Sequence, residues 1–348
     1  MANKQAAVLV AGSFGTALAA VLADNGHAVR LWSRSSDQVE EINVSRKNSR
    51  YHPDIELPAG IYATTNLEEA LTGSNLVLFA APSSVMREVA RQAAPHIGPD
   101  VLCVHATKGF EADSLKRMST VLAEELGREE QSIVVLSGPS HAEEVVRRCP
   151  TTVVVASQEQ SVAEAVQDYF INSYFRVYTN PDALGVEVAG AIKNIIALGA
   201  GLSDGLGFGD NAKAALMTRG LAEIGRLGTA MGANLITFAG LAGIGDLVVT
   251  CTSRHSRNWR AGSLLAQGIS LEEVLSRMGM VVEGVRTTRA ARALAAAYDV
   301  QMPITEQLYA VLFEAKEPKI AVEALMGRVR THESEQVAKE WQNGGSEV

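Results

Sequence analysis

The stretch Ala6-Ala-Val-Leu-Val-Ala-Gly-Ser-Phe-Gly-Thr16 decides the fold of the N-terminal half of the chain. An apolar run over residues 6–10 leads into a turn that contains Gly12 and Gly15, and a helical pattern follows over residues 16–25. A continuous apolar run is typical of a strand that is covered on both faces. A strand, a glycine turn and a helix in this order open the α/β units that hold a phosphate at the helix N-terminus.

The same alternation of short apolar runs and helical stretches continues to about residue 180. It predicts a mostly parallel sheet with helices on both faces, that is, a Rossmann-type α/β domain. After Pro181, long Ala-, Leu- and Gly-rich segments predict an all-α domain. We therefore expect domains at residues 1–183 and 184–348, with a frayed tail after about residue 332. The predicted strands are residues 6–10, 28–32, 76–80, 101–105, 133–136, 152–155 and 175–178.

Composition excludes several classes of protein. A chain of 348 residues with 47% hydrophobic content is long enough for two packed cores. Its net charge of -8 argues against a nucleic-acid or anionic-membrane partner bound through a basic surface. Cys103, Cys149 and Cys251 are too far apart in sequence for a disulfide framework or a CxxC metal site, which favours a reducing, cytoplasmic setting. The charge-free stretch 6–23 is interrupted by glycines, so we predict no signal or membrane-spanning segment.

The glycine turn departs from the usual dinucleotide-binding pattern at its first position. In GxGxxG the first glycine allows a tight turn, and this chain has Val10 there. A β-branched residue tolerates an unusual φ poorly, so we expect weakened but not abolished cofactor binding. Arg34, 19 residues after Gly15, replaces the acidic residue that would hold the ribose 2′-hydroxyl of NAD. It can pair with the 2′-phosphate of NADP, although a solvated surface arginine is the alternative.

Lys193 is the only charged residue between Glu187 and Asp204. It lies in a nearly all-apolar run, and a helix that is apolar all round is a buried helix. Burial lowers the pKa of a lysine, so a buried Lys193 could act as a base near pH 7. A lysine whose head reaches water, or one held in a structural ion pair, would give the same pattern.

Four other stretches combine glycine with polar or basic residues. Thr107-Lys-Gly109 and Gly138-Pro-Ser-His-Ala142 follow predicted strands at the carboxyl ends, where open α/β sheets bind ligands. Gly240-Leu-Ala-Gly-Ile-Gly-Asp246 and Ser253-Arg-His-Ser-Arg-Asn258 precede predicted helices. Arginine and the free amides of a helix start hold phosphate well. Each stretch alone could also be an ordinary turn or helix cap.

In this order, the motifs closely resemble those of the bacterial NAD(P)-dependent glycerol-3-phosphate dehydrogenases, over about residues 6–330. The resemblance implies a Rossmann domain joined to a helical domain with the active site between them, and usually a homodimer. It implies NADP(H) or NAD(H), or both, as the cofactor. The most specific stretches are Gly138-Pro-Ser-His-Ala-Glu-Glu144, Glu187-Val-Ala-Gly-Ala-Ile-Lys-Asn194, Gly205-Leu-Gly-Phe-Gly-Asp-Asn-Ala-Lys213, Gly243-Ile-Gly-Asp-Leu247 and Ser253-Arg-His-Ser-Arg-Asn258.

Carried over by position, the resemblance implies that Lys193 is the general acid/base and that Asp246 is its counter-charge. We expect no metal site. Phe14 stands where the family usually has Trp. The implied substrate contacts are Lys108, Gly138, Ser140, Lys193, Asp246, Ser256, Arg257 and Asn258. The implied cofactor contacts are Gly12, Ser13, Phe14, Gly15, Arg34, Lys108, Ala142, Arg257, Val281 and Glu283.

The implied reaction is the reversible oxidation of sn-glycerol 3-phosphate to dihydroxyacetone phosphate, which would supply glycerol 3-phosphate for phospholipid synthesis. The expected partner is thus a small molecule rather than a nucleic acid. One alternative is a related two-domain dehydrogenase of 6-phosphogluconate or a β-hydroxy acid. A second, motivated by Val10, is a non-catalytic dinucleotide-binding protein.

Overall fold

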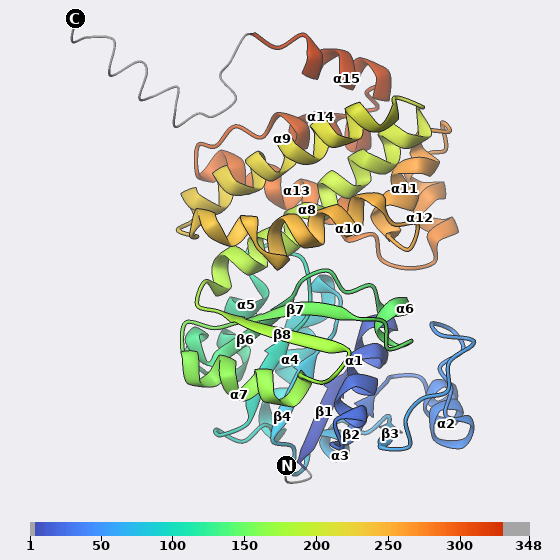
Figure 1. Cartoon of the computed structure of the whole chain (residues 1–348), viewed down its shortest axis with the longest axis vertical. Helices are drawn as coiled ribbons and strands as arrows, with labels where there is room; N and C mark the ends of the chain where they lie inside the picture. The colour runs from blue at the N-terminus through green and yellow to red at the C-terminus, as the bar shows by residue number, and fades with distance from the viewer. Residues whose placement is uncertain (1–3, 330–348) are drawn as a thin grey trace, which may run out of the picture.

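The computed structural model describes residues 4–329, which form an α/β part and a helical part stacked along the long axis of the molecule (Figure 1). The α/β part holds one eight-stranded sheet in the order β3-β2-β1-β4-β5-β6-β7-β8. Only the β6–β7 pair is antiparallel. The predicted fold class is confirmed. The strands are β1 (Gln5–Leu9), β2 (Ala28–Trp32), β3 (Ile61–Thr64), β4 (Leu76–Phe79), β5 (Leu102–His105), β6 (Ile133–Ser137), β7 (Thr151–Ala156) and β8 (Phe175–Asn180).

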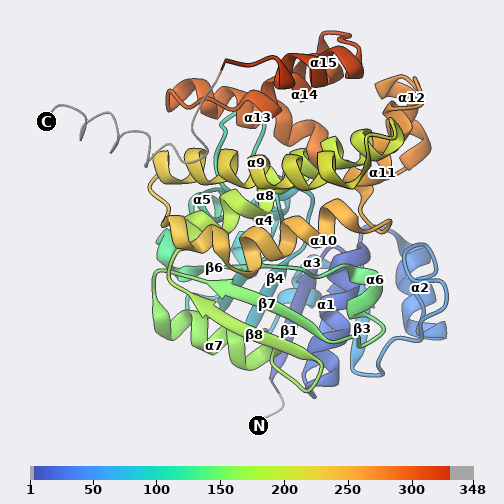
Figure 2. The same ribbon diagram turned by 45° about the horizontal axis from the view of Figure 1, so that its top comes forward.

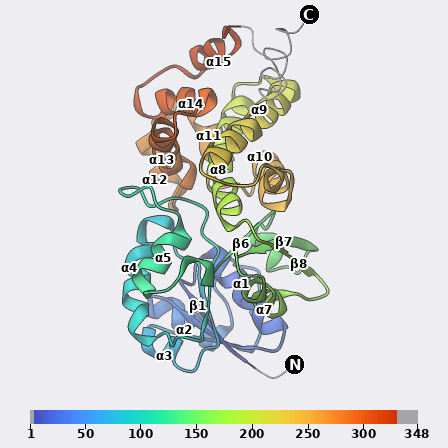
Figure 3. The ribbon, with the colours of Figure 1, turned by 90° about the vertical axis from the view of Figure 1, so that its left-hand side faces the viewer.

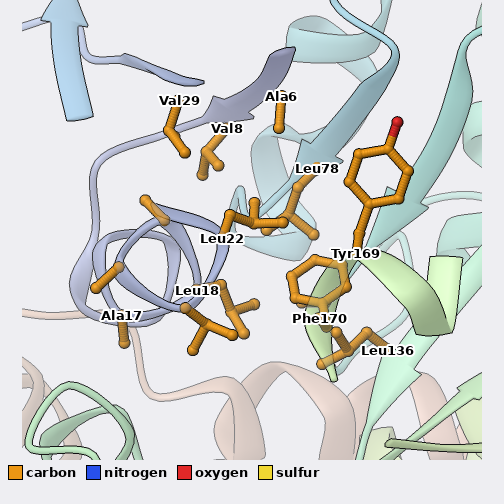
Figure 4. Close-up of a cluster of buried hydrophobic side chains, with 14 of the residues drawn as sticks. Ala6, Val8, Ala17, Leu18, Leu22, Val29, Leu78, Leu136, Tyr169 and Phe170 are labelled. Atoms are coloured by element: carbon orange, nitrogen blue, oxygen red, sulfur yellow. The ribbon is translucent and has the colours of Figure 1, made fainter. Parts of the chain in front are cut away.

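Helices cover both faces of the sheet, as the apolar strands require (Figure 3). On one face, α1 (Ser13–Asp24) and α7 (Gln160–Phe170) pack on alternate residues of the central strands. Figure 4 shows Leu18 and Leu22 of α1 beside Val8, Leu78 and Phe170 in this core. The other face is covered by α3 (Leu67–Leu71), α4 (Met86–Ala93) and α5 (Met118–Leu126).

Strand β1 lies at the point where the strand order reverses, because β2 and β3 lie on one side of it and β4 on the other. In open α/β sheets, ligands bind in the crevice outside the carboxyl ends of the strands at this point. The sequence pattern does not predict β3. That strand is short, lies at the sheet edge and carries the half-exposed Tyr62, so its apolar run is too brief to recognise.

The helical part is organised around α8 (Ala183–Gly205), which α9, α10, α11 and α13 surround (Figure 2). By length and composition α8 could cross a membrane, but 89% of its most apolar window is buried inside the protein, as expected of a core helix. The other helices of this part are α9 (Gly209–Ala230), α10 (Asp246–Thr252), α11 (Arg257–Leu265), α12 (Leu271–Met278), α13 (Glu283–Ala297), α14 (Pro303–Phe313) and α15 (Pro318–Met326).

The expected boundary between residues 183 and 184 falls at the first residues of α8, whose early turns pack on β6. The tail expected to fray lies outside the described residues. Two further helices of the α/β part are α2 (Ser36–Ser45) and α6 (Ala142–Val145). Short 3₁₀ segments occur at Ser83–Val85, Ala94–His96, Glu130–Ser132 and Leu235–Ala239, and a π-helical turn spans Leu241–Gly245 just before α10.

Candidate active site

A cavity of about 480 Å³ is lined by residues of both parts of the molecule. Its walls come from the carboxyl ends of β1, β4 and β5, the starts of α6 and α11, the middle of α8 and the segment before α13. Of the predicted site residues, Gly12, Ser13, Phe14, Lys108, Ser140, Ala142, Lys193, Ser256, Arg257, Asn258, Val281 and Glu283 line it. Gly15, Arg34, Gly138 and Asp246 are outside its lining.

The glycine turn presents the start of α1 to this cavity. Gly12 is the N-cap residue, and no side chain caps the helix, so the first amides of α1 are free to meet an anion. A Cβ on Gly12 would meet no protein atom within 4 Å, which leaves the approach to these amides open. A Cβ on Gly15 would lie 2.3 Å from the carbonyl oxygen of Val10, so Gly15 allows α1 to pack against the strand end. The turn therefore fits a dinucleotide pyrophosphate.

Val10 adopts the left-handed conformation that the first glycine position of the turn requires. Its φ is +81°, whereas β-branched side chains rarely occupy this region. The amides of Val10 and Ala11 both donate to the carbonyl oxygen of Trp32, at 3.1 and 3.0 Å, and hold the turn in place. Backbone strain of this kind costs on the order of 1–3 kcal/mol.

We expect Val10→Gly to raise the free energy of unfolding by about 1 kcal/mol, because strain relief exceeds the entropy cost of a new glycine. The variant should also bind NADPH more tightly, since the turn loses a side chain that lines the cavity. Denaturant unfolding and equilibrium NADPH binding measure the two effects. Ala11→Gly is the matched control, because Ala11 is not among the residues with positive φ and should only lose stability. Unchanged NADPH affinity in Val10→Gly would refute the link to binding.

A loop far along the chain supports the glycine turn from behind. The buried side chain of Asn48 donates to the carbonyl oxygen of Ala11 at 3.1 Å and to Thr16 Oγ1 at 2.8 Å. His52 Nε2 lies 2.9 Å from the carbonyl oxygen of Ser13. These contacts bring Arg50 and Tyr51 into the cavity wall. These four residues were not predicted, since no local sequence pattern connects this loop to the turn.

Three charged side chains meet at the base of the cavity. Asp246 is 1% exposed and accepts hydrogen bonds from Lys193 and, at 2.7 Å, from Lys108. Lys108 Nζ also donates to the carbonyl oxygen of Gly138 at 3.0 Å. Lys193, 4% exposed, donates to Thr250 Oγ1 at 2.6 Å. The expected burial and pairing of Lys193 are thus observed, and Asp246 lies behind both ammonium groups rather than in the cavity wall.

Burial lowers the pKa of Lys193 to about 7, in opposition to the carboxylate of Asp246 and with a contribution from the neighbouring charge of Lys108. Burial alone would raise the pKa of Asp246, but Lys108 and Lys193 together hold it below the usual value. Lys193 can therefore exchange a proton near neutral pH while Asp246 remains ionised. A base of this pKa, with access to a cavity, suits general acid/base chemistry.

The start of α11 supplies the groups suited to an anion. Arg257 is exposed at the cavity and forms no ion pair within residues 4–329. Ser256 caps α11 by accepting from the amide of Trp259 at 3.2 Å. The side chain of Asn258 donates to Asn194 Oδ1 and accepts from the amide of Gly284, both at 2.8 Å, and so ties α11 to α8 and α13.

In the loop after β6, Ser140 Oγ donates to the carbonyl oxygen of Gly138 at 2.9 Å.

Glu283 connects the two parts at the wall of the cavity. Its carboxylate accepts from the amide and hydroxyl of Ser83, at 3.2 and 2.8 Å. Arg34 is exposed at the end of β2, at the place where the adenosine end of a dinucleotide would lie. Phe14 lies close to Lys108, whose Nζ is 6.0 Å from the ring centre. Of the predicted cofactor residues, all but Gly15 and Arg34 line the cavity.

Four polar residues of the cavity wall were not among the predicted site residues, although three of them lie in stretches singled out in the sequence: Thr250, Asn194, His141 and His255. Thr250 follows Asp246 by one helical turn and could have been found by that spacing. Asn194 directly follows Lys193. Among the described residues, no group of three or more His, Cys, Asp or Glu side chains is placed to hold a metal ion.

Comparison with known proteins identifies the family. The models described as the N-terminus and the C-terminus of NAD-dependent glycerol-3-phosphate dehydrogenase match residues 5–163 and 182–323. The chain belongs to this family. The glycerol-3-phosphate dehydrogenase models thus cover both the turn at Gly12 and the Lys193–Asp246 pair.

Relatives agree over nearly the full length. A glycerol-3-phosphate dehydrogenase [NAD(P)+] of Bacillus velezensis is 57% identical over 98% of this chain and 99% of its own. One from Bacillus cereus is 59% identical over 95% of this chain and 97% of its own. The crystal structure of glycerol-3-phosphate dehydrogenase from Coxiella burnetii has a TM-score of 0.89 at 40% identity and covers 93% of this chain and 99% of its own.

Proposed function

We propose that this protein catalyses the reversible oxidation of sn-glycerol 3-phosphate to dihydroxyacetone phosphate. It is an NAD(P)-dependent oxidoreductase of the glycerol-3-phosphate dehydrogenase family. The observation that carries the chemistry is the buried Lys193, which reaches the cavity while paired with Asp246. The exposed Arg257 at the helix start in the same cavity supports a phosphorylated substrate.

The side chains of the cavity have distinct proposed roles. A bound NAD(P) would supply the hydride chemistry at C2 of the substrate. Lys193 Nζ takes the proton of the C2 hydroxyl during oxidation. In the reverse direction, protonated Lys193 polarises the ketone and returns the proton to the oxygen on C2. Asp246 keeps the ammonium oriented, while Arg257 and the amides of α11 hold the phosphate. Lys108, Ser140 and Asn258 complete the substrate contacts.

The proposed cofactor contacts have separate roles as well. The amides of the turn at Gly12 and the start of α1 are suited to the pyrophosphate. Arg34 is proposed to pair with the 2′-phosphate of NADP, so NADPH should be accepted. Glu283 and Val281 would face the cofactor from the helical part. By resemblance to the family, we further propose that the protein is a cytoplasmic homodimer that supplies glycerol 3-phosphate for phospholipid synthesis.

One assay tests the proposed reaction. Consumption of NADPH and of NADH is followed in parallel by absorbance, with dihydroxyacetone phosphate as the substrate. We expect oxidation of at least one cofactor, because Lys193 and Arg257 line one cavity and Lys193 pairs with Asp246. Separate reactions with 6-phosphogluconate or a β-hydroxy acid and NADP or NAD test the alternative dehydrogenases. No turnover with dihydroxyacetone phosphate would overturn the proposal, whether or not the protein binds NADPH.

A further inference from the structure

Glu187 is a buried carboxylate that the proposed reaction does not use. It lies on α8, 6% exposed, and both its oxygens accept hydrogen bonds. Oε1 accepts from the amide of Ser119 at 2.9 Å and lies 3.1 Å from His105 Nε2. Oε2 accepts from Ser119 Oγ at 2.6 Å and from Arg117 Nη1 at 2.5 Å. Burial would raise the pKa of Glu187, but His105, Arg117 and Ser119 lower it to about 2.

These partners lie at the two ends of the β5–α5 loop (residues 106–117). His105 is the last residue of β5, Arg117 closes the loop, and Ser119 is in the first turn of α5. Lys108 belongs to this loop, three residues after His105. One carboxylate on α8 therefore hydrogen-bonds the far end of the loop that carries Lys108, at Arg117 and Ser119, and lies beside its start at His105. Glu130, which also pairs with Arg117, is more exposed than Glu187, with 36% against 4% of the side chain accessible.

Two more residues of α8 touch the same loop from the same helix face. Gly190 lies so close that a Cβ there would be 3.5 Å from Lys108 Cγ. Asn194 Nδ2 donates to the carbonyl oxygen of Lys108 at 3.3 Å. Glu187, Gly190 and Asn194 are three and four residues apart, which places them on one side of the helix. This side of α8 thus sets the position of Lys108 relative to Lys193, which follows on the adjacent face.

We propose that Glu187 is a positioning residue for the reaction. By anchoring the β5–α5 loop to α8, it holds Lys108 against Asp246, so that Asp246 is shared between Lys108 and Lys193. Glu187 itself does not line the cavity and does not reach the reacting atoms. The inference rests on the proposed function, because it concerns the environment of Lys193.

The expected consequence follows from the charges around Lys193. Asp246 and Cys251 on α10, Lys108 on the β5–α5 loop and His141 at the start of α6 are the ionisable groups that act on it. If the loop loosens, Lys108 moves away and Asp246 is left to Lys193 alone. Both changes favour the protonated amine, so the pKa of Lys193 rises. Oxidation needs the neutral amine, and its rate should then require a higher pH.

The test compares Glu187→Gln with Glu223→Gln in the full-length protein. Glu223 is the matched control: it is also buried, on α9, and accepts from the amides of Ile304 and Thr305 at the start of α14, outside the cavity. We expect kcat for Glu187→Gln to fall about 10- to 100-fold, since small displacements of reacting groups have effects of this size. The pH at which oxidation reaches half its maximal rate should rise. Glu223→Gln should change neither.

A folded Glu187→Gln with wild-type kcat and pH profile would overturn the proposal. So would a Glu223→Gln variant whose kcat and pH profile change as much as those of Glu187→Gln. If Glu187→Gln does not fold, Ser119→Ala decides, because it removes only one of the hydrogen bonds to Glu187. That variant should shift the pH profile in the same direction by a smaller amount, and no shift counts against the proposal. Lys193→Ala in the same assay separates the proposed acid/base role of Lys193 from the positioning role of Glu187. Retained activity there refutes the role of Lys193, whereas lost activity with an unshifted Glu187→Gln profile refutes the positioning role alone.

Discussion

Replacing Lys193 with alanine should lower kcat by about 10²- to 10⁴-fold in both directions, the range that general acid/base catalysis contributes. Binding of NADPH should persist, because the turn at Gly12 and the start of α1 do not depend on this side chain. Asp246 retains its hydrogen bond from Lys108 at 2.7 Å, so the variant leaves no unpaired carboxylate in the interior. Steady-state kinetics and equilibrium NADPH binding give the two readouts.

The pH dependence identifies the group further. With a pKa of about 7, Lys193 is neutral above this pH and protonated below it. Oxidation of glycerol 3-phosphate requires the neutral amine, so its kcat should rise as the pH passes through 7. Reduction of dihydroxyacetone phosphate requires the protonated amine, so its kcat should fall over the same range. Both limbs should disappear in Lys193→Ala.

Two controls make the result specific. Lys213→Ala removes a lysine that is also paired with an aspartate, Asp204 at 2.8 Å, but that does not line the cavity, so kcat should be unchanged. Added methylamine should restore part of the activity of Lys193→Ala, because the small amine can occupy the space left by the side chain. Turnover near the wild-type value in Lys193→Ala would eliminate this residue as the acid/base.

Local patterns predicted most of the sheet because its strands are buried on both faces. The residues Ala6, Val8 and Leu9 of β1 are all inaccessible to solvent, and an apolar run records that directly. Strand β3 was not predicted, because an edge strand with the half-exposed Tyr62 has no such apolar run. The antiparallel β6–β7 pair also could not be predicted, since strand direction depends on how the connection through α6 folds back.

The site was only partly predictable, for a related reason. Lys193 is recognisable because a single charge in an apolar helix must be buried. Its partner Asp246 lies 53 residues away and Lys108 lies 138 residues from Asp246, so no spacing rule links the three. The conformation of Val10, in contrast, depends only on local sequence. The φ that its position demands follows from the turn alone, and the structure has it.

Asp246→Asn should damage the protein more than Lys193→Ala does, because it lowers both stability and kcat. Asp246 is the only carboxylate, among the described residues, that hydrogen-bonds Lys108 and Lys193, and asparagine would leave both amino groups facing a neutral amide. Removing one member of a buried ion pair costs about 3–5 kcal/mol. Without the carboxylate, the pKa of Lys193 falls further below its value of about 7. At pH 7 the residue would then lack the proton that reduction requires.

We therefore expect kcat for reduction of dihydroxyacetone phosphate to fall at least about 10²-fold in Asp246→Asn, and more steeply than kcat for oxidation. Asp182→Asn is the control: Asp182 caps α8 through the amide of Gly185 and also accepts from Thr237, but contacts neither lysine. It should lose stability without this loss of turnover. Adding Lys108→Met to Asp246→Asn removes one of the unpaired charges, so part of the stability should return while kcat stays low. Wild-type kcat in Asp246→Asn would show that the carboxylate does not set the protonation of Lys193.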